Sequence, residues 1–259
     1  MVEVFWGITG RGGYIDVVPS EEAVMISAGS LWRGNGFKKK QRWPWKRWML
    51  DSGGYLCLSR FKEYPWTLDD YLKLIRELKP TFAASMDYCC EPSLSLNTEM
   101  SVEDRVRASA DMANYLCKKS DCVFPVIQGV EFDDYYLSWK LTESLRPKLV
   151  GIGSVCRRQN LGEIAHLCEF LGSIIPEGVM RHGFGVKMLA MKKNECRKFF
   201  TSIDTNAWEF WRRAEKWSGR RWTLKESWDI YSSKLRTLCE IPVKPQPRSF
   251  FLSDMNANK

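Results

Sequence analysis

The chain has 259 residues, of which 44% are hydrophobic, and a formal net charge of +8. This length suffices for one large α/β domain with a sizeable core, or for two small domains. The segment after Met1 lacks a basic region followed by an apolar one, and no apolar stretch approaches the ~20 residues that cross a bilayer. We therefore expect a cytoplasmic protein rather than a secreted one or a membrane protein.

The positive charge is concentrated in two stretches that are rich in tryptophan. The first runs from residue 38 to 48, contains no acid, and holds Lys38, Lys39, Lys40, Arg42, Lys46 and Arg47. The second spans residues 208–225 and includes Arg212 and Arg213. Cations neutralise phosphates and indoles stack on bases, so both stretches predict contact with a polyanion such as a nucleic acid. The alternative is that the excess charge only keeps the protein soluble.

The nine cysteines are scattered, form no CxxC pair, and are accompanied by only two histidines, His166 and His182. An odd number of cysteines without a secretory signal is typical of reduced thiols. Zinc would need a cluster of ligands, and the sequence shows none. We therefore expect no metal and no other cofactor.

Short apolar runs that end in a carboxylate, an amide or a glycine recur along the chain. They cover residues 47–50, 82–86, 123–127, 149–150 and 199–203, and lead into Asp51, Asp87, Gln128, Gly151 and Asp204. Buried parallel strands have such continuous apolar runs. We therefore interpret these five segments as parallel strands.

Segments with helical spacing lie between these runs, at residues 68–78, 101–118, 132–145, 161–171 and 192–199, with Thr67 and Ser101 as N-caps of the first two. This alternation predicts a parallel α/β sheet. Because the polar residues follow at least five strands, we favour a single-domain (β/α)8 TIM-like barrel over a doubly wound sheet, which concentrates its site at one point. We assign residues 1–240 to the barrel, and 241–259 to an extended, proline-rich tail.

The strand-end residues include two carboxylates with possible roles in catalysis. Asp204 follows an apolar strand, where burial is costly unless the group is paired or functional. It could attack an anomeric carbon, or it could simply cap a helix at 207–214. Asp51 precedes Gly53 and Gly54, which allow the backbone to approach a ligand; the alternative is a tight turn capped by Asp51.

Other residues at these positions have groups suited to binding a base. The Asp87 carboxylate and the Gln128 amide could read a purine edge, since a carboxylate accepts hydrogen bonds and an amide both donates and accepts them. Tyr55 offers a flat face for stacking. An ordinary turn remains an alternative for Gln128 and Gly129.

Six short motifs in order resemble the tRNA-guanine transglycosylase superfamily over roughly residues 45–213. They are Asp51-Ser-Gly-Gly-Tyr55, Met86-Asp87, Val126-Ile-Gln-Gly129, Gly151-Ile-Gly-Ser-Val155, His182-Gly-Phe-Gly185 and Ser202-Ile-Asp-Thr-Asn-Ala-Trp208. The last two look closer to the archaeal and DNA-acting branches than to the bacterial tRNA enzyme. The DNA-acting branch comprises the DNA 7-deazaguanine transglycosylases (DpdA-type) of phages and bacteria.

The resemblance implies a (β/α)8 barrel that exchanges a base in a nucleic acid. Asp204 matches the nucleophile and Asp51 the general acid/base. The residues that match the base pocket are Tyr55 for stacking, Asp87 and Gln128 for reading the base, and Gly129, Gly153 and Ser154 for the wall and floor.

Two departures from the superfamily bear on the substrate. The tRNA enzymes carry a zinc site of cysteines and a histidine after the nucleophile, whereas here only Cys239 follows Asp204. The chain is also too short for the RNA-binding domains of the archaeal enzymes. Both departures favour DNA, with guanine exchanged for a 7-deazaguanine such as preQ0 to protect phage or bacterial DNA from restriction. The same reaction on tRNA, or a barrel that only binds nucleic acid, remains an alternative. The sequence leaves a homodimer or an accessory protein open.

Overall fold

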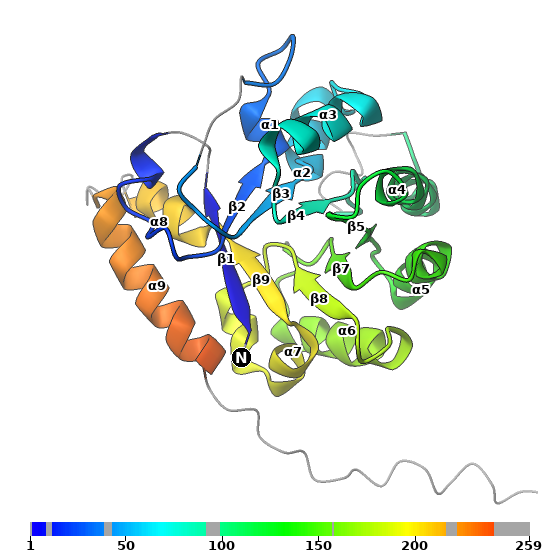
Figure 1. Cartoon of the computed structure of the whole chain (residues 1–259). Helices are drawn as coiled ribbons and strands as arrows, with labels where there is room; N and C mark the ends of the chain where they lie inside the picture. The colour runs from blue at the N-terminus through cyan, green and yellow to red at the C-terminus, as the bar shows by residue number, and fades with distance from the viewer. Residues whose placement is uncertain are drawn as a thin grey trace, which may run out of the picture.

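The computed structural model describes residues 2–8, 12–38, 43–91, 99–156, 158–215 and 222–240. Nine strands in these ranges form one parallel sheet that is nearly closed into a barrel, with the helices outside it (Figure 1). They are β1 (Glu3–Ile8), β2 (Val24–Ser27), β3 (Trp48–Asp51), β4 (Phe82–Ala84), β5 (Val123–Phe124), β6 (Val126–Ile127), β7 (Leu149–Ile152), β8 (Met180–Gly183) and β9 (Ser202–Thr205). This architecture confirms the expected single-domain α/β barrel.

The barrel closes through a strand that is interrupted at Pro125. The sheet order is β5-β4-β3-β2-β1-β9-β8-β7-β6, so its two edge strands follow one another directly in the chain. Pro125 has no N–H to donate, but its carbonyl accepts from the Gly151 N–H at 2.9 Å, while the Phe124 carbonyl accepts from Ser85 N–H at 2.9 Å. β5 therefore pairs with β4 and β6 with β7, and the two together occupy one position of an eightfold barrel.

The helices lie between successive strands and continue beyond the last one. They are α1 (Ala28–Leu31), α2 (Gly54–Phe61), α3 (Leu68–Leu78), α4 (Val102–Cys117), α5 (Phe132–Thr142), α6 (Leu161–Ile174), α7 (Asn194–Phe199), α8 (Ala207–Glu215) and α9 (Leu224–Glu240), with short 3₁₀ turns at Gly12–Tyr14, Glu143–Leu145 and Met188–Lys192. Thr67 and Ser101 form the capping boxes of α3 and α4 with Asp70 and Asp104. Both predicted N-caps are confirmed.

Several elements differ from the sequence prediction. The strands β1, β2 and β8 and the helices α1, α2 and α9 were not predicted, and β9 begins at Ser202 rather than at residue 199. Phe199 ends α7 and Phe200 is its C-cap, so these two aromatic residues pack around a turn instead of extending the strand. The proposed tail at 241–259 lies outside the described residues.

The barrel interior below the strand ends is apolar. Buried residues from successive strands form one cluster there, namely Phe5, Ala23, Met49, Ala84, Phe124, Val126 and Leu149. Outside the sheet, Trp228 of α9 packs against Trp6 of β1, with ring centroids 4.5 Å apart, and against Trp208 of α8 at 5.5 Å. This packing places α8 and α9 over β1, as Figure 1 shows.

Candidate active site at the carboxyl ends of the strands

The polar residues that follow the predicted strands meet at one end of the barrel. Asp51 ends β3, Asp87 follows β4, Gln128 follows β6, and Asp204 lies in β9. They line a cavity of about 260 Å³, here called the reaction cavity, together with Met25, Ser27, Gly53, Gly54, Tyr55, Leu56, Cys89, Glu91, Gly153, Ser154, Cys156 and Phe184. Segments that are far apart in the sequence therefore contribute to one site, as the carboxyl ends of parallel strands do in such barrels.

A chain of hydrogen bonds fixes one wall of the reaction cavity. The Asp87 carboxylate accepts from the Ser52 hydroxyl at 2.7 Å and from the Gln128 amide nitrogen at 2.5 Å. The Gln128 amide oxygen in turn accepts from the Ser154 hydroxyl at 2.5 Å. Because each link fixes the next, the orientation of the Gln128 amide is set: its nitrogen faces Asp87 and its oxygen faces Ser154.

The Asp87 backbone is held by a buried tyrosine. The Tyr64 hydroxyl donates to the Asp87 carbonyl at 2.9 Å and accepts from the Asp87 N–H at 3.1 Å. The same hydroxyl lies 3.0 Å from the Ser52 hydroxyl. Asp87 is therefore held through both its side chain and its backbone, so that the position of the carboxylate is fixed before a ligand arrives.

Two of the carboxyl groups have perturbed proton affinity. Burial raises the pKa of Asp51 to about 6. A hydrogen bond from Ser27 opposes this rise in pKa, and the charge of Asp204 adds to it. Burial raises the pKa of Asp87 to about 7, opposed by the hydrogen bond from Ser52 and reinforced by the charge of Asp51. Both groups can therefore gain or lose a proton near neutral pH, which an ordinary aspartate cannot do.

Asp204 is buried and is positioned from the end of β8. Its Oδ1 accepts from the Gly185 N–H at 2.7 Å, and Nε2 of His182 lies 3.5 Å from the same oxygen. His182 is itself fully buried, with its Nδ1 2.9 Å from the Ser202 hydroxyl. Gly185 has a φ of +60°, which suits glycine and brings its N–H toward the carboxylate. The His182-Gly-Phe-Gly185 motif thus supports Asp204.

Glycine at position 153 is required by the adjacent amide of Gln128. A Cβ atom at Gly153 would lie 2.2 Å from the Gln128 amide nitrogen, so a side chain there would displace the amide. Ser154, the next residue, has a φ of +55°, an uncommon conformation for a residue other than glycine. The chain turns sharply here, and its course directs the Ser154 hydroxyl at Gln128.

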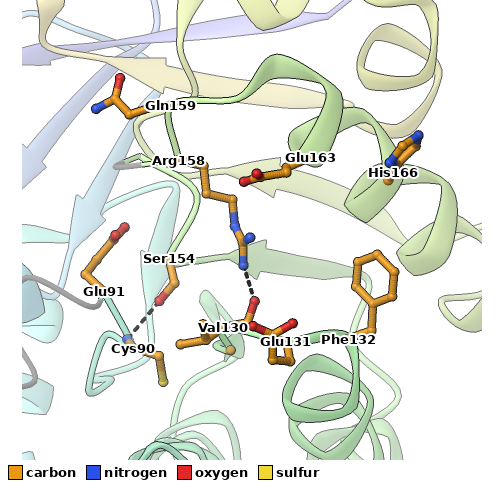
Figure 2. Close-up of a pocket in the computed structure, with 11 residues that line it drawn as sticks. Cys90, Glu91, Val130, Glu131, Phe132, Ser154, Arg158, Gln159, Glu163 and His166 are labelled. Atoms are coloured by element: carbon orange, nitrogen blue, oxygen red, sulfur yellow. Dashed lines mark hydrogen bonds between the residues drawn. The ribbon is translucent and has the colours of Figure 1, made fainter.

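The remaining predicted base-binding residues lie in two places. Tyr55 is in the first turn of α2, lines the reaction cavity, and is 37% exposed. Gly129 packs under α5, where a Cβ would lie 2.7 Å from the Tyr135 ring, and it lines an adjoining cavity rather than the reaction cavity. That second cavity is shown in Figure 2.

The sequence did not single out several of the residues that shape the site. Ser27 and Ser52 hold carboxylates, Tyr64 holds the Asp87 backbone, and Glu91, Cys156 and Phe184 line the cavity. Ser52 lies inside the Asp51-Ser-Gly-Gly-Tyr55 motif and Phe184 inside the His182-Gly-Phe-Gly185 motif, so these two were within reach of the motif argument. Of the others, Ser27 ends β2, and Tyr64, Glu91 and Cys156 stand outside the helices and strands, with no distinctive pattern.

The basic residues predicted to bind nucleic acid are distributed over different parts of the molecule. Arg47 lies at the amino end of β3, opposite the reaction cavity, and forms a bidentate ion pair with Glu3 at 2.6 and 3.0 Å. Arg212 pairs in the same way with Glu209 of its own helix. Lys38 and Lys46 are exposed. Lys39, Lys40 and Arg42 lie outside the described residues, as does the side chain of Arg213.

The tryptophans of the first basic stretch belong largely to the core. Trp45 is 4% exposed and Trp48 is 6% exposed, and the Trp45 indole N–H donates to the Val18 carbonyl at 3.2 Å. The expectation that these two indoles stack on bases is therefore wrong, because the barrel uses their large apolar area for packing.

Within the described ranges, no three His, Cys, Asp or Glu side chains are grouped so that they could hold a metal ion. In the same ranges, none of the helices combines the length and the hydropathy that crossing a bilayer requires.

The fold and the site together define a (β/α)8 barrel protein with an enzyme-type cavity at the carboxyl ends of its strands, where barrel enzymes place their reacting groups. The profile of one family, DpdA, described as DeoxyPurine in DNA protein A, matches residues 38–219. The chain belongs to this family, and its role is accordingly in the modification of deoxypurines in DNA with 7-deazaguanine. No curated protein matches the chain.

Proposed function

We propose that this protein is a DNA guanine transglycosylase, which exchanges guanine in DNA for a 7-deazaguanine such as preQ0 through a covalent intermediate on Asp204. The observation that carries the proposal is the shared cavity: Asp51 and Asp204 line it together with Asp87 and Gln128. Asp51 and Asp204 suit attack at a sugar carbon, and Asp87 and Gln128 suit the reading of a purine edge.

The first half of the reaction cleaves the glycosidic bond. The target nucleotide leaves the base stack, which costs a few kcal/mol, and enters the reaction cavity, where stacking on an aromatic ring such as Tyr55 returns ~1–3 kcal/mol. The Asp204 carboxylate attacks C1′, the bond from C1′ to N9 breaks, and its electron pair goes to guanine. Asp51 gives its proton to the departing base, which leaves the sugar bonded to Asp204.

The second half reverses these steps with a different base. Asp51, now ionised, takes the N9 proton of the incoming 7-deazaguanine, N9 bonds to C1′, and the bond to Asp204 breaks. A group that must give and then take one proton works best when its pKa lies near the ambient pH. The raised pKa of Asp51, about 6, supports this role.

Base recognition follows from the wall formed by Asp87 and Gln128. The Asp87 carboxylate can accept from the N1–H and the exocyclic amine of guanine, and the Gln128 amide can donate to O6. Both side chains are almost fully buried and held by Ser52 and Ser154, so they need little reorganisation when the base binds.

Two alternatives concern the substrate and the presence of catalysis. The same reaction on tRNA would need the same cavity, and the family description, which names DNA, favours DNA over it. A barrel that only binds nucleic acid would have no use for two carboxylates that interact electrostatically in one cavity. A cytoplasmic location, in the host if the protein is encoded by a phage, stays a prediction, as does protection of the DNA from restriction.

The proposal is tested by incubating the protein with radiolabelled guanine and either duplex DNA, single-stranded DNA or tRNA. Incorporation into DNA is the expected result, and the Asp204→Ala protein serves as the inactive control. Label that enters only tRNA would assign the reaction to tRNA. Label in none of the three would show that the barrel only binds nucleic acid.

A further inference from the structure

A second cavity, of about 580 Å³, adjoins the reaction cavity and has no part in the reaction described above. It is lined by Cys90, Glu91, Gly129, Val130, Glu131, Phe132, Ser154, Arg158, Gln159, Glu163 and His166 (Figure 2). Glu91 and Ser154 line both cavities, so the two are separated by single side chains. Its volume is within the range of small-molecule sites.

Arg158 contributes a guanidinium to the wall of this second cavity. Its guanidinium lies over the Tyr135 ring, 5.9 Å from the centroid, and donates to the Val130 carbonyl. Its Nε is inaccessible to solvent and finds no acceptor among the described residues. The guanidinium lines the cavity and can only donate hydrogen bonds, so it favours a ligand that carries an acceptor.

Among the described residues that line the cavity, the other charged groups are carboxylates. Glu91 is buried in the wall toward the reaction cavity and accepts from the Cys156 thiol at 3.1 Å, while Glu131 and Glu163 stand at the exposed rim. Ionised carboxylates only accept hydrogen bonds, so they favour a ligand that carries donors. In this described part of the lining, three carboxylates face a single guanidinium, and this balance disfavours a phosphate. The ligand therefore carries both donors and an acceptor without a large negative charge.

An aromatic ring completes one side of the second cavity. Phe132 is 44% exposed, and its other contacts hold it in place, since its ring stacks on Phe170 of α6 at 4.7 Å between centroids. In Figure 2, Phe132 and His166 lie on one side of Arg158, and Glu91 and Ser154 on the other. A flat aromatic ligand with donors and acceptors along its edge matches these walls, and nucleobases have this chemistry.

We propose that the second cavity is a nucleobase-binding subsite. This inference rests on the proposed function, because exchange requires two free bases to pass through a reaction cavity that is less than half as large as its neighbour. The base can come from two sources: a free guanine or 7-deazaguanine on its way out or in, or the base next to the target nucleotide in the DNA.

The first arm of the test measures free base. Equilibrium dialysis of the full-length protein with tritiated guanine should show two bound equivalents if free base occupies the second cavity. Arg158→Ala and Phe132→Ala should each weaken one of the two sites about tenfold, whereas Asp87→Asn should weaken only the other. Tyr136→Ala, which removes an exposed ring from the same helix outside the cavity, should change neither site.

The second arm measures a base within DNA. Oligonucleotides with one target guanine and an abasic nucleotide on either side should bind the wild-type protein about tenfold more weakly than the intact strand if the flanking base occupies the cavity. Arg158→Ala should remove that difference. Two results together would overturn the proposal. In the first arm the wild-type protein would bind one guanine equivalent, and in the second arm abasic flanks would weaken binding no more in the wild-type protein than in Arg158→Ala.

Failure of this inference can be told from failure of the proposed function. Dialysis and oligonucleotide binding need no turnover, so the second subsite can be present in a protein that exchanges no base. Conversely, normal exchange by wild-type protein with a single guanine equivalent and no effect of Arg158→Ala would leave the proposed function standing and remove the subsite.

Discussion

The two ends of the barrel are built from the same strands, but their charged groups differ in exposure and in the sign of their neighbours. At the amino end, Arg47 is exposed, pairs with Glu3, and covers the ring of Phe82 at 5.0 Å. At the carboxyl end, Asp51, Asp87 and Asp204 share one small cavity, and the charge of one raises the pKa of another. The amino end pairs opposite charges, whereas the carboxyl end brings like charges together.

This difference shows where the fold accepts a loss of stability. A surface ion pair contributes at most about 1 kcal/mol, and its groups can be exchanged freely. Desolvated carboxylates lower stability once they ionise, and they persist only because buried hydroxyls and backbone N–H groups hold them. Perturbed carboxylates at one end of a barrel are therefore a functional feature, and the following predictions test that contrast between the ends.

The largest effect is expected at Asp204. Asp204→Asn keeps the size of the side chain and removes the attacking oxygen, so capture of DNA and guanine exchange should both fall by at least about 10⁴-fold. A protein–DNA adduct that survives denaturation reports capture, and labelled guanine reports exchange. Glu3→Gln at the opposite end is the matched control and should retain both. Exchange by Asp204→Asn at even a tenth of the normal rate would remove Asp204 as the nucleophile.

Asp51→Asn should slow the reaction about 10²- to 10⁴-fold and abolish a characteristic pH dependence. With its pKa at about 6, Asp51 holds a proton below that pH and is ionised above it. Capture, which consumes the proton, should therefore slow as the pH rises through about 6. Transfer of the new base from Asp204, which needs ionised Asp51, should accelerate over the same range.

Separate measurements of the two half-reactions check this prediction. Quenched-flow adduct formation follows capture, and release of the adduct after addition of a 7-deazaguanine follows the transfer. If both half-reactions respond to pH with the same sign in the wild-type protein, Asp51 does not carry the proton between them.

Asp87 should make the protein less stable as the pH rises. The native carboxyl keeps its proton up to about pH 7, whereas the unfolded one loses it near its ordinary value of 3.8. Between these values the native state binds more protons, so the free energy of unfolding falls with rising pH, by up to about 4 kcal/mol for this group. Asp51 adds a change of the same sign.

Asp87→Asn should remove the Asp87 share of this loss and flatten the pH profile of urea unfolding. The amide can still accept from Ser52, and the Gln128 amide can reverse because the Ser154 hydroxyl both donates and accepts. The variant should nevertheless bind guanine more weakly, since it lacks the carboxylate that accepts from the base. A pH profile as steep as that of the wild-type protein would show that Asp87 is ionised throughout.

The elements and residues that the sequence predicted are those with a local signal. α3 and α4 have capping boxes and an apolar stripe within a few residues, and the strand-end pattern pointed to four of the residues that line the reaction cavity, Asp51, Asp87, Gln128 and Asp204. Their catalytic and base-reading roles stay predictions. By contrast, β8 contains Arg181 and His182, and pairing with β7 and β9 makes it a strand although its own sequence lacks an apolar run.

Sequence patterns did not predict the side chains that surround the carboxylates. The hydroxyls of Ser27 and Tyr64 become important only because the fold brings them to the Asp51 carboxylate and to the Asp87 backbone, and serine and tyrosine occur in many other places. Composition also predicted base stacking by Trp45 and Trp48, although an indole in a basic stretch can equally face the core. Burial is decided by long-range packing that a single sequence does not display.

The smallest effect is expected at the amino end, where it completes the comparison. Glu3→Gln leaves Arg47 exposed and still packed over Phe82, so the free energy of unfolding should fall by at most about 1 kcal/mol. Moderate salt should abolish the difference, because the pair is open to solvent. Urea unfolding at low and high ionic strength measures both. A loss of guanine exchange in a Glu3→Gln protein of normal stability would show that the two ends are coupled, since no reacting group lies near Glu3.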